Sequence, residues 1–288
     1  LRALMQATRE KIQQALHHFT SAESLYDQSI HFFRKLGYPT DRQMRQDTDD
    51  WESLLDQAGE RRSLLDKDKA LVAETKSVHL LFQMTERDLH KQLGLFEDPD
   101  SVDVRINSYL FFALELRKDY YARGKLAEAT RQINRLFQMP VMVLFRHGER
   151  LTLAIIDRRP NKLDAGRDVL EKVSMVRDVH IAEPHRGDLE ILHDLSLDSL
   201  KSQYRIEHFD HLQSAFRDIL NISRLNQNFY RELSKWYFWA RDIVEFPDDE
   251  IADRDTRNAL GTIRLITRLV FVWFLKAKGL IPDCLFDY

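Results

Sequence analysis

The chain has 288 residues, of which 43% are hydrophobic and 31% are charged, a composition typical of a folded globular protein and not of a disordered one. Its nine glycines and seven prolines are less than half of the usual share of about 12%, which predicts a helix-rich fold. The formal net charge of −3 shows that the molecule as a whole has no excess of positive charge for binding a polyanion. The single cysteine, Cys284, excludes internal disulfides and cysteine-rich zinc modules and favours a reducing compartment, the cytoplasm. Because the chain begins at Leu1 without a methionine, we expect it to be part of a longer protein.

The first segment, residues 1–75, is predicted to be a helical N-terminal region. Apolar residues recur at helical spacing up to Leu36, and Gly37 and Pro39 end this pattern. Residues 51–73 have a helical composition with weak periodicity.

The middle segment, residues 76–182, alternates between strand and helix patterns. Strands are predicted at residues 78–82, 102–106, 109–117, 141–145 and 151–156, and helices at residues 85–93 and 123–137. Residues 167–180 fit either a helix or a strand. The segment therefore predicts a mixed sheet with a helix packed on it, and the whole chain an α+β fold with helical regions at both ends.

The last segment, residues 183–288, returns to helical spacing, and its final helix is expected at residues 255–278. The apolar stretch 263–275 is interrupted by Arg264 and Arg268 and is too short for a bilayer core of about 30 Å, so we expect no membrane span. We expect this helix to bury Ile266, Leu269, Val270 and Phe274 against neighbouring helices. An open apolar surface would instead indicate a docking face for a further domain. The aromatic run 236–239 is expected to lie in the core.

Asp103, Glu115 and Arg117 form the first candidate site. Side chains alternate along a strand, so Glu115 and Arg117 are expected on one face of the strand 109–117, and Asp103 on the polar face of the preceding strand. We expect a carboxylate oxygen of Asp103 or Asp157 within about 6 Å of Glu115. Converging carboxylates favour a shared Mg²⁺ held by Asp103 and Glu115, which can support phosphodiester hydrolysis. The alternative is a surface ion pair at a sheet end.

A second candidate site is basic. Between Arg105 and Arg186 there are 16 Lys and Arg residues against 10 Asp and Glu residues. The residues expected to contact DNA phosphates are Arg123, Arg131, Arg135, Arg146, His147, Arg158, Arg159 and Lys162. The alternative, of equal weight, is that each pairs with a nearby acid such as Glu128, Glu149 or Asp157. The sequence has no phosphate-binding glycine loop, no Gly-x-Ser-x-Gly elbow and no Rossmann fingerprint.

Several longer strings carry a resemblance to a known family. They are residues 109–116, 130–135, 139–148, 168–173, 184–186, 229–233 and 263–276. In this order, over roughly residues 76–288, the chain resembles the N-terminal part of bacterial type IIG restriction-modification proteins. In these proteins an endonuclease region precedes an adenine-specific DNA methyltransferase.

The resemblance implies a PD-(D/E)XK nuclease-like middle domain, residues 76–182, and a helical connector, residues 183–288, that leads to a methyltransferase domain in cis. It places Glu115 at the acidic position and Arg117 where a lysine is usual. The methyltransferase signatures do not occur in this sequence, so S-adenosylmethionine would bind beyond Tyr288.

The function expected from this resemblance is Mg²⁺-dependent hydrolysis of double-stranded DNA in phage defence. Asp103, Glu115 and Arg117 would be catalytic. The alternatives are an inactive nuclease-fold module that positions DNA or docks the methyltransferase domain, and a purely structural helical scaffold.

Overall fold

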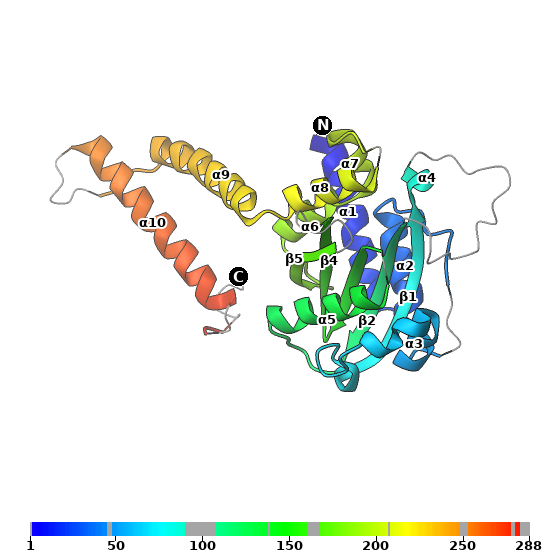
Figure 1. Ribbon diagram of the computed structural model, residues 1–288. Helices are drawn as coiled ribbons and strands as arrows, with labels where there is room; N and C mark the ends of the chain where they lie inside the picture. The colour runs from blue at the N-terminus through cyan, green and yellow to red at the C-terminus, as the bar shows by residue number, and fades with distance from the viewer. Residues whose placement is uncertain are drawn as a thin grey trace. The chain divides into compact units, whose positions relative to one another are not determined.

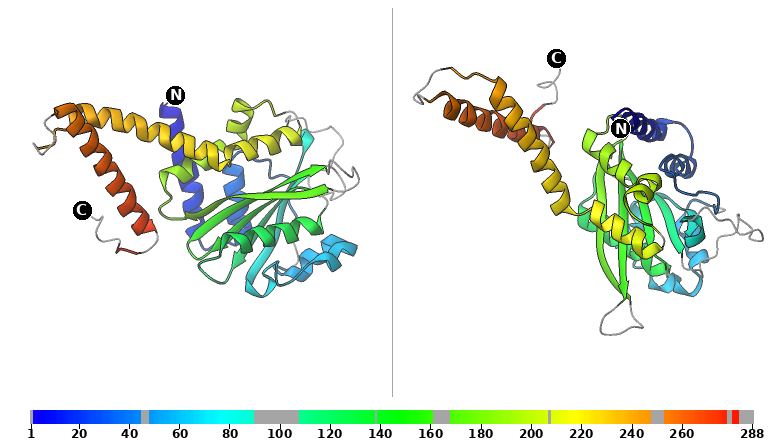
Figure 2. Two further views of the ribbon diagram at one scale, coloured as in Figure 1. Left: turned by 60° about the vertical axis from the view of Figure 1, so that its left-hand side comes forward. Right: turned by 90° about the horizontal axis from the view of Figure 1, so that it is seen from above.

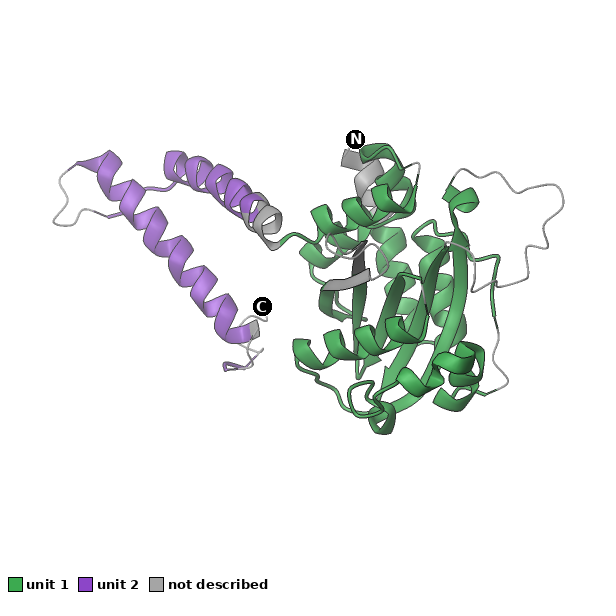
Figure 3. Ribbon diagram, in the orientation of Figure 1, with its two compact units in different colours: residues 1–221 green, residues 222–288 purple. Residues whose placement is uncertain are grey.

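The computed structural model describes residues 2–44, 48–89, 108–137, 139–160, 168–206, 208–247, 253–277 and 280–282. Of residues 2–8, 157–160, 168–171, 222–226, 228 and 277 it describes the backbone alone. The chain divides into two compact units, residues 1–221 and residues 222–288 (Figure 3).

The first unit is built on a five-stranded mixed sheet in the order β1-β2-β3-β4-β5 (Figure 1). The strands are β1 (Thr75–Thr85), β2 (Ser108–Leu116), β3 (Val141–His147), β4 (Arg150–Pro160) and β5 (Asp168–His180). The β2 and β3 strands are parallel, and the other neighbours are antiparallel. The crossover between the parallel strands is α5 (Arg123–Leu136). The predicted α+β class is therefore confirmed, and the described part of the ambiguous stretch 167–180 is the strand β5, Asp168–His180.

The sheet has a hydrophobic core on each face, as the alternation along β2 predicts. Tyr109, Phe111 and Ala113 belong to one core, whereas the even-numbered residues from Leu110 to Leu116 belong to the other. The second core also contains the inner stripe of α5, formed by Leu126, Ala129, Ile133, Leu136 and Phe137. Strands that are buried on both faces read as continuous apolar runs, which explains the sequences of β2 and β3.

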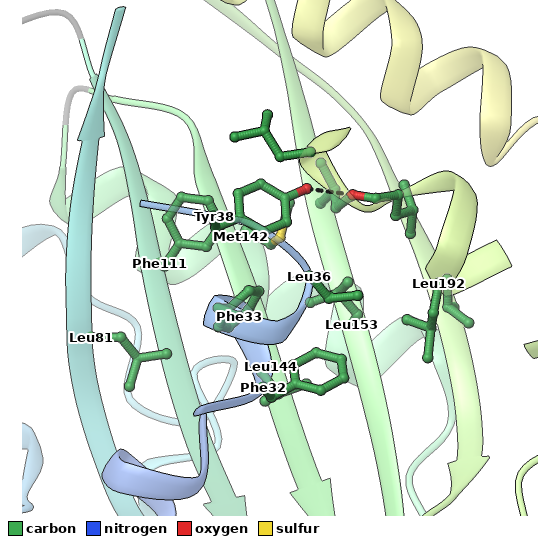
Figure 4. Packing of buried hydrophobic residues seen from close by; sticks show 14 of the residues in the cluster. Phe32, Phe33, Leu36, Tyr38, Leu81, Phe111, Met142, Leu144, Leu153 and Leu192 are labelled. Atoms are coloured by element: carbon green, nitrogen blue, oxygen red, sulfur yellow. Dashed lines mark hydrogen bonds between the residues drawn. The ribbon is translucent and has the colours of Figure 1, made fainter. Parts of the chain in front are cut away.

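The N-terminal helices cover the first face of the sheet (Figure 2). They are α1 (Arg2–His17), the 3₁₀ turn η1 (His18–Thr20) and α2 (Leu25–Lys35). The helix α2 begins after Ser24, whose side chain accepts a hydrogen bond from the Asp27 amide. Phe32 and Phe33 of α2 pack with Phe111 and Met142 of the sheet, and the Tyr38 hydroxyl donates to the Leu195 carbonyl at 2.7 Å (Figure 4).

The second face carries α5 and α3 (Trp51–Ala58). The helix α3 begins after Asp50, whose carboxylate accepts from the Ser53 amide at 2.9 Å. Two 3₁₀ turns, η2 (Gly59–Leu64) and η3 (Val72–Glu74), connect α3 to β1. Helical structure within residues 1–75 is thus confirmed for the described residues, with a break between the first two helices.

Four further helices lie among the described residues of the first unit. They are α4 (Glu86–Leu89), α6 (Arg186–Asp194), α7 (Leu197–Gln203) and α8 (Phe209–Ile219). The predicted helix 85–93 corresponds to α4, and its residues from position 90 lie outside the described residues. The predicted strand 102–106 also lies outside them.

The second unit contains α9 (Ile222–Ile243) and α10 (Arg254–Ala277), which pack as a pair. The expected burial of α10 is wrong: Leu269, Val270 and Phe274 are 55%, 43% and 49% exposed. The expected burial of the aromatic run is also wrong, since Trp239 is 59% exposed. An apolar composition predicts a covered helix only where another element covers it, and within the second unit the described residues leave these faces open.

Among the described helices, α10 is the one with the length and composition of a membrane span. A single such helix is weak support for a membrane role, because core helices of other proteins have the same composition. Arg264 and Arg268 lie within its apolar part.

Candidate functional site

Glu115 lies at the carboxyl end of β2, on the face that α2 covers. Its register partners are Ser77 on β1 and Arg146 on β3. Directly paired residues on adjacent strands point to the same face, so this face continues across three strands. The Glu115 side chain is 27% exposed, and its Oε1 lies 3.1 Å from the Lys76 Nζ. Solvent and ligands can therefore reach the carboxylate, which already has one cation beside it.

A β-bulge in β1 lies next to Glu115. Ser77 pairs with Glu115 but Thr75 pairs with Leu116, so β1 has one extra residue at this point. The extra residue brings Lys76 to the Glu115 carboxylate. Bulges often redirect a side chain beside a functional site.

Arg146 is held on the other side of Glu115 by α2. Its Nη1 donates to Oε1 of Gln28 at 3.0 Å, and Gln28 is fully buried. The Gln28 amide nitrogen in turn donates to the carbonyls of Phe19 and Ser21. A buried amide with partners on both ends fixes its neighbours, so Arg146 has a defined position.

Arg117 lies one residue beyond the end of β2 and is exposed. Its backbone N–H donates to the Glu74 carbonyl at 2.8 Å. The carboxylate of Glu74 pairs with Lys118 at 3.0 Å, and the hydrogen bond from Lys118 lowers the pKa of Glu74. No carboxylate of the described residues pairs with the Arg117 guanidinium.

Asp103, the expected partner of Glu115, lies outside the described residues. The other expected partner, Asp157, is excluded by the strand register. Arg146 pairs with Leu151 on β4, so Asp157 is six residues further along this strand, about 20 Å away. The expectation that Asp157 approaches Glu115 is therefore wrong.

The described residues do not complete a magnesium site. They contain no group of three or more His, Cys, Asp or Glu side chains placed to hold a metal ion. Glu115 supplies one carboxylate, whose nearest charged partner is the Lys76 ammonium. A hard cation needs several oxygen ligands, so the described chain fits Mg²⁺ only in part.

The basic residues of α5 differ in whether their side chains already have hydrogen-bond or ion-pair partners within the protein. Arg123 donates to the Val173 carbonyl at 3.2 Å, and Arg131 pairs with Glu128 at 3.1 Å. Burial raises the pKa of Glu128, but hydrogen bonds from Gln132 and Arg131 outweigh it and leave this pKa lowered. Arg135 is exposed and is the member of this helix best placed to contact a phosphate.

The structure does not bring the remaining basic residues to one place. Arg146 lies at the turn between β3 and β4, whereas Arg158 and Arg159 lie at the opposite end of β4, seven or more residues or about 23 Å away. The side chains of this pair, and Lys162 as a whole, lie outside the described residues.

His147 is fully buried beside the same turn. Its Nδ1 lies 3.0 Å from the Asp119 carbonyl, and its Nε2 lies 3.1 Å from Oγ1 of Thr152. The expected DNA contact of this ring is not available in this structure, because both ring nitrogens are used internally.

A cavity of about 490 Å³ lies between residues 67–74 and the beginning of α5. It is lined by equal numbers of cations and acids, namely Lys67, Lys69, Lys125, Asp68, Glu74 and Glu128. Glu115 is not part of this lining. The balanced charge gives the cavity no preference for an anion.

Two contacts around the site were not predicted from the sequence, that of Lys76 with Glu115 and that of Gln28 with Arg146. Lys76 is 39 residues from Glu115 and Gln28 is 118 residues from Arg146. Regular alternation along β1 would place Lys76 on the face opposite Glu115. Nothing in the sequence around Gln28 indicates that this residue contacts Arg146. A search for a cation at the start of the strand that pairs with β2 would have found Lys76.

Comparisons with models of protein families, with curated proteins and with solved structures found no match to this chain. The functional argument therefore depends on the fold and on the residues described above.

Proposed function

We propose that this chain is the endonuclease-like, DNA-contacting N-terminal portion of a type IIG restriction-modification protein that acts against phage DNA in the cytoplasm. The observation that carries the proposal is the order β1, β2, α5, β3, with Glu115 at the carboxyl end of β2. This strand, strand, helix, strand order is used by PD-(D/E)XK nucleases. An acidic side chain at the end of the strand before the crossover helix is consistent with their type of site.

Hydrolysis of double-stranded DNA with Mg²⁺ requires a second oxygen ligand besides Glu115, and Asp103 is the residue proposed for it. The bound ion would supply charge stabilisation at the phosphate and an activated water. In the described chain, Glu115 contributes a partly exposed carboxylate, and Arg135 contributes an exposed cation on α5, which packs on the other face of the sheet.

The test measures binding and cleavage of a plasmid and of a short duplex. We expect weak binding without sequence preference, with log affinity falling linearly against log salt by about 0.9 per phosphate contacted. The double variant Arg158→Glu, Arg159→Glu is expected to flatten this slope. The matched control is Arg241→Glu, which reverses a charge in the second unit that pairs with Asp242.

Glu115→Ala separates catalysis from binding. We expect this variant to bind the duplex nearly as well as the unmodified chain and to lose Mg²⁺-dependent cleavage. Cleavage that survives Glu115→Ala would show that the active site lies elsewhere. Absence of duplex binding at low salt would refute the DNA-contacting role.

A second candidate function is a module that docks the methyltransferase domain in cis without cleaving DNA. The exposed apolar surface of α9 and α10 favours it, with Phe238, Leu269 and Phe271 each more than half exposed, because exposed patches of this kind mark interaction sites. The test is binding of this chain to the separately produced methyltransferase domain of its parent protein. Loss of binding in Leu269→Glu would support docking, and binding that survives this substitution would contradict it.

A further inference from the structure

We infer that Lys76 is the cation that acts with Glu115 at the phosphate of the DNA strand to be cleaved, the role that the sequence offered to Arg117. The inference rests on the proposed function, because it assigns a residue to the same site. Three observations carry it: the β1 bulge, the position of each nearby cation, and the exposure of the pair.

The bulge is the first observation. In a regular antiparallel pair, the residue before Ser77 would face Leu116 and point to the face opposite Glu115. The extra residue in β1 breaks this alternation, and the Lys76 ammonium instead lies 3.1 Å from the Glu115 carboxylate. The bulge thus lies where it brings the Lys76 ammonium to the Glu115 carboxylate, and bulges are frequent next to functional sites for this reason.

The other cations near Glu115 are less suitable. The guanidinium of Arg146 is hydrogen-bonded to the buried Gln28, so moving it to a ligand would leave a buried acceptor without its donor. Arg117 follows the end of β2, and its backbone is bonded to Glu74. Lys76 is therefore the cation that is in contact with Glu115 and has no buried hydrogen-bond partner among the described residues.

The exposure of the pair suits a phosphate ligand. The Lys76 side chain is 49% exposed and that of Glu115 is 27% exposed, so the ammonium lies on the solvent side. A lone carboxylate repels a phosphodiester, whereas a compact ammonium beside it offsets this repulsion and donates up to three hydrogen bonds. The carboxylate would hold the lysine in place while the remaining ammonium hydrogens reach the phosphate oxygens.

The experiment uses the full 288-residue chain with a supercoiled plasmid and Mg²⁺ or Mn²⁺. We compare Lys76→Ala, Lys76→Arg and Arg117→Ala. The matched control is Lys69→Ala, because the Lys69 side chain is 55% exposed, against 49% for Lys76, and pairs with Asp66 at 2.8 Å. Lys76→Ala is expected to lower the cleavage rate at saturating DNA by about 100-fold or more, as for removal of a positioned donor. Lys76→Arg should recover part of the rate, Arg117→Ala should lose much less than Lys76→Ala, and Lys69→Ala should lose nothing.

The second readout needs no catalysis. Duplex binding is measured in EDTA over a salt series, where Lys76→Ala should reduce the magnitude of the log-log slope by about 0.9, one phosphate contact. Thermal unfolding of each variant confirms that it folds.

The outcomes separate this inference from the proposed function. If the unmodified chain cleaves DNA and Lys76→Ala retains both the rate and the slope, Lys76 is not the cation at the site, while the nuclease function stands. If Arg117→Ala alone abolishes cleavage, the role belongs to Arg117. If the unmodified chain does not cleave with either ion, the proposed nuclease activity is refuted, and the assignment of Lys76 with it.

Discussion

Phe111 is the buried residue that most directly connects the core to the candidate site. It lies in β2 four residues before Glu115, on the same face. Its ring stacks on Phe82 with the centroids 4.2 Å apart and the planes at 14°, and it meets Phe33 edge-on at 5.1 Å. The fully buried Phe111 side chain thus connects β2 to the edge strand β1 and to α2. Figure 4 shows Phe111 and Phe33 in this core.

Phe111→Ala is expected to lower the free energy of unfolding of the first unit by about 3–5 kcal/mol, the range for truncating a buried phenylalanine. The upper half of this range is expected here, because the stacked and edge-on aromatic contacts are lost together with the buried area. For a unit of this size the unfolding temperature should fall by about 2–4 °C for each kcal/mol.

The assay is unfolding in urea followed by near-ultraviolet circular dichroism, with Phe229→Ala as the control. Phe229 is 51% exposed, so its truncation should change the free energy of unfolding by no more than about 0.5 kcal/mol. A loss below about 1 kcal/mol for Phe111→Ala, the average for all substitutions, would refute the packing of the Phe111 ring against Phe33 of α2 and Phe82 of β1.

Three further predictions concern pH, a turn and the second unit. Burial lowers the pKa of His79 below its usual 6.5, although the nearby Asp49 opposes this shift. As the pH falls, the unfolded chain therefore takes up the His79 proton before the folded chain does, so the free energy of unfolding should fall below about pH 6.5. His79→Gln should remove this dependence in urea unfolding measured from about pH 5 to 8. Gly148 has a φ of +55°, and an added Cβ would lie 2.8 Å from Oδ1 of Asp119, so Gly148→Ala should cost about 1–3 kcal/mol in the same assay; an unchanged midpoint would contradict the turn geometry. Leu269→Lys should reduce binding of a fluorescent hydrophobic dye while changing the free energy of unfolding by at most about 0.5 kcal/mol, and a large destabilisation would show that Leu269 is covered.

The sequence predicted those helices and strands in which buried residues recur at the regular spacing of a strand or a helix. The alternation of β2 and the inner stripe of α5 are both observed, since each residue's face depends only on local backbone geometry. The strand at residues 168–180 was ambiguous because its apolar residues, among them Val173 and Val176, fit both periods. Its pairing with β4 decides it, and pairing is a non-local interaction.

The sequence failed where long-range register decides position. Arg146 and Arg158 are only 12 residues apart, and this proximity suggested one basic cluster. They lie on opposite sides of the turn between β3 and β4, and the 11-residue length of β4 carries Arg158 to the far end of the sheet. The bulge at Lys76 is likewise a property of the pairing between β1 and β2, so no pattern within either strand reveals it.

The N-terminal helices are part of the support of the candidate site and not only a cover for the core. The helix α2 holds Gln28, whose amide is fixed by the carbonyls of Phe19 and Ser21 and whose oxygen accepts from Arg146. Arg146 is the register partner of Glu115, so Gln28 fixes the side chain that lies next to Glu115 on the neighbouring strand. The site thus has a rigid side, built from α2 and β3, and an exposed side, formed by Lys76. A phosphate that approaches Glu115 would therefore meet Lys76 on the side open to solvent, where the carboxylate holds the ammonium at 3.1 Å.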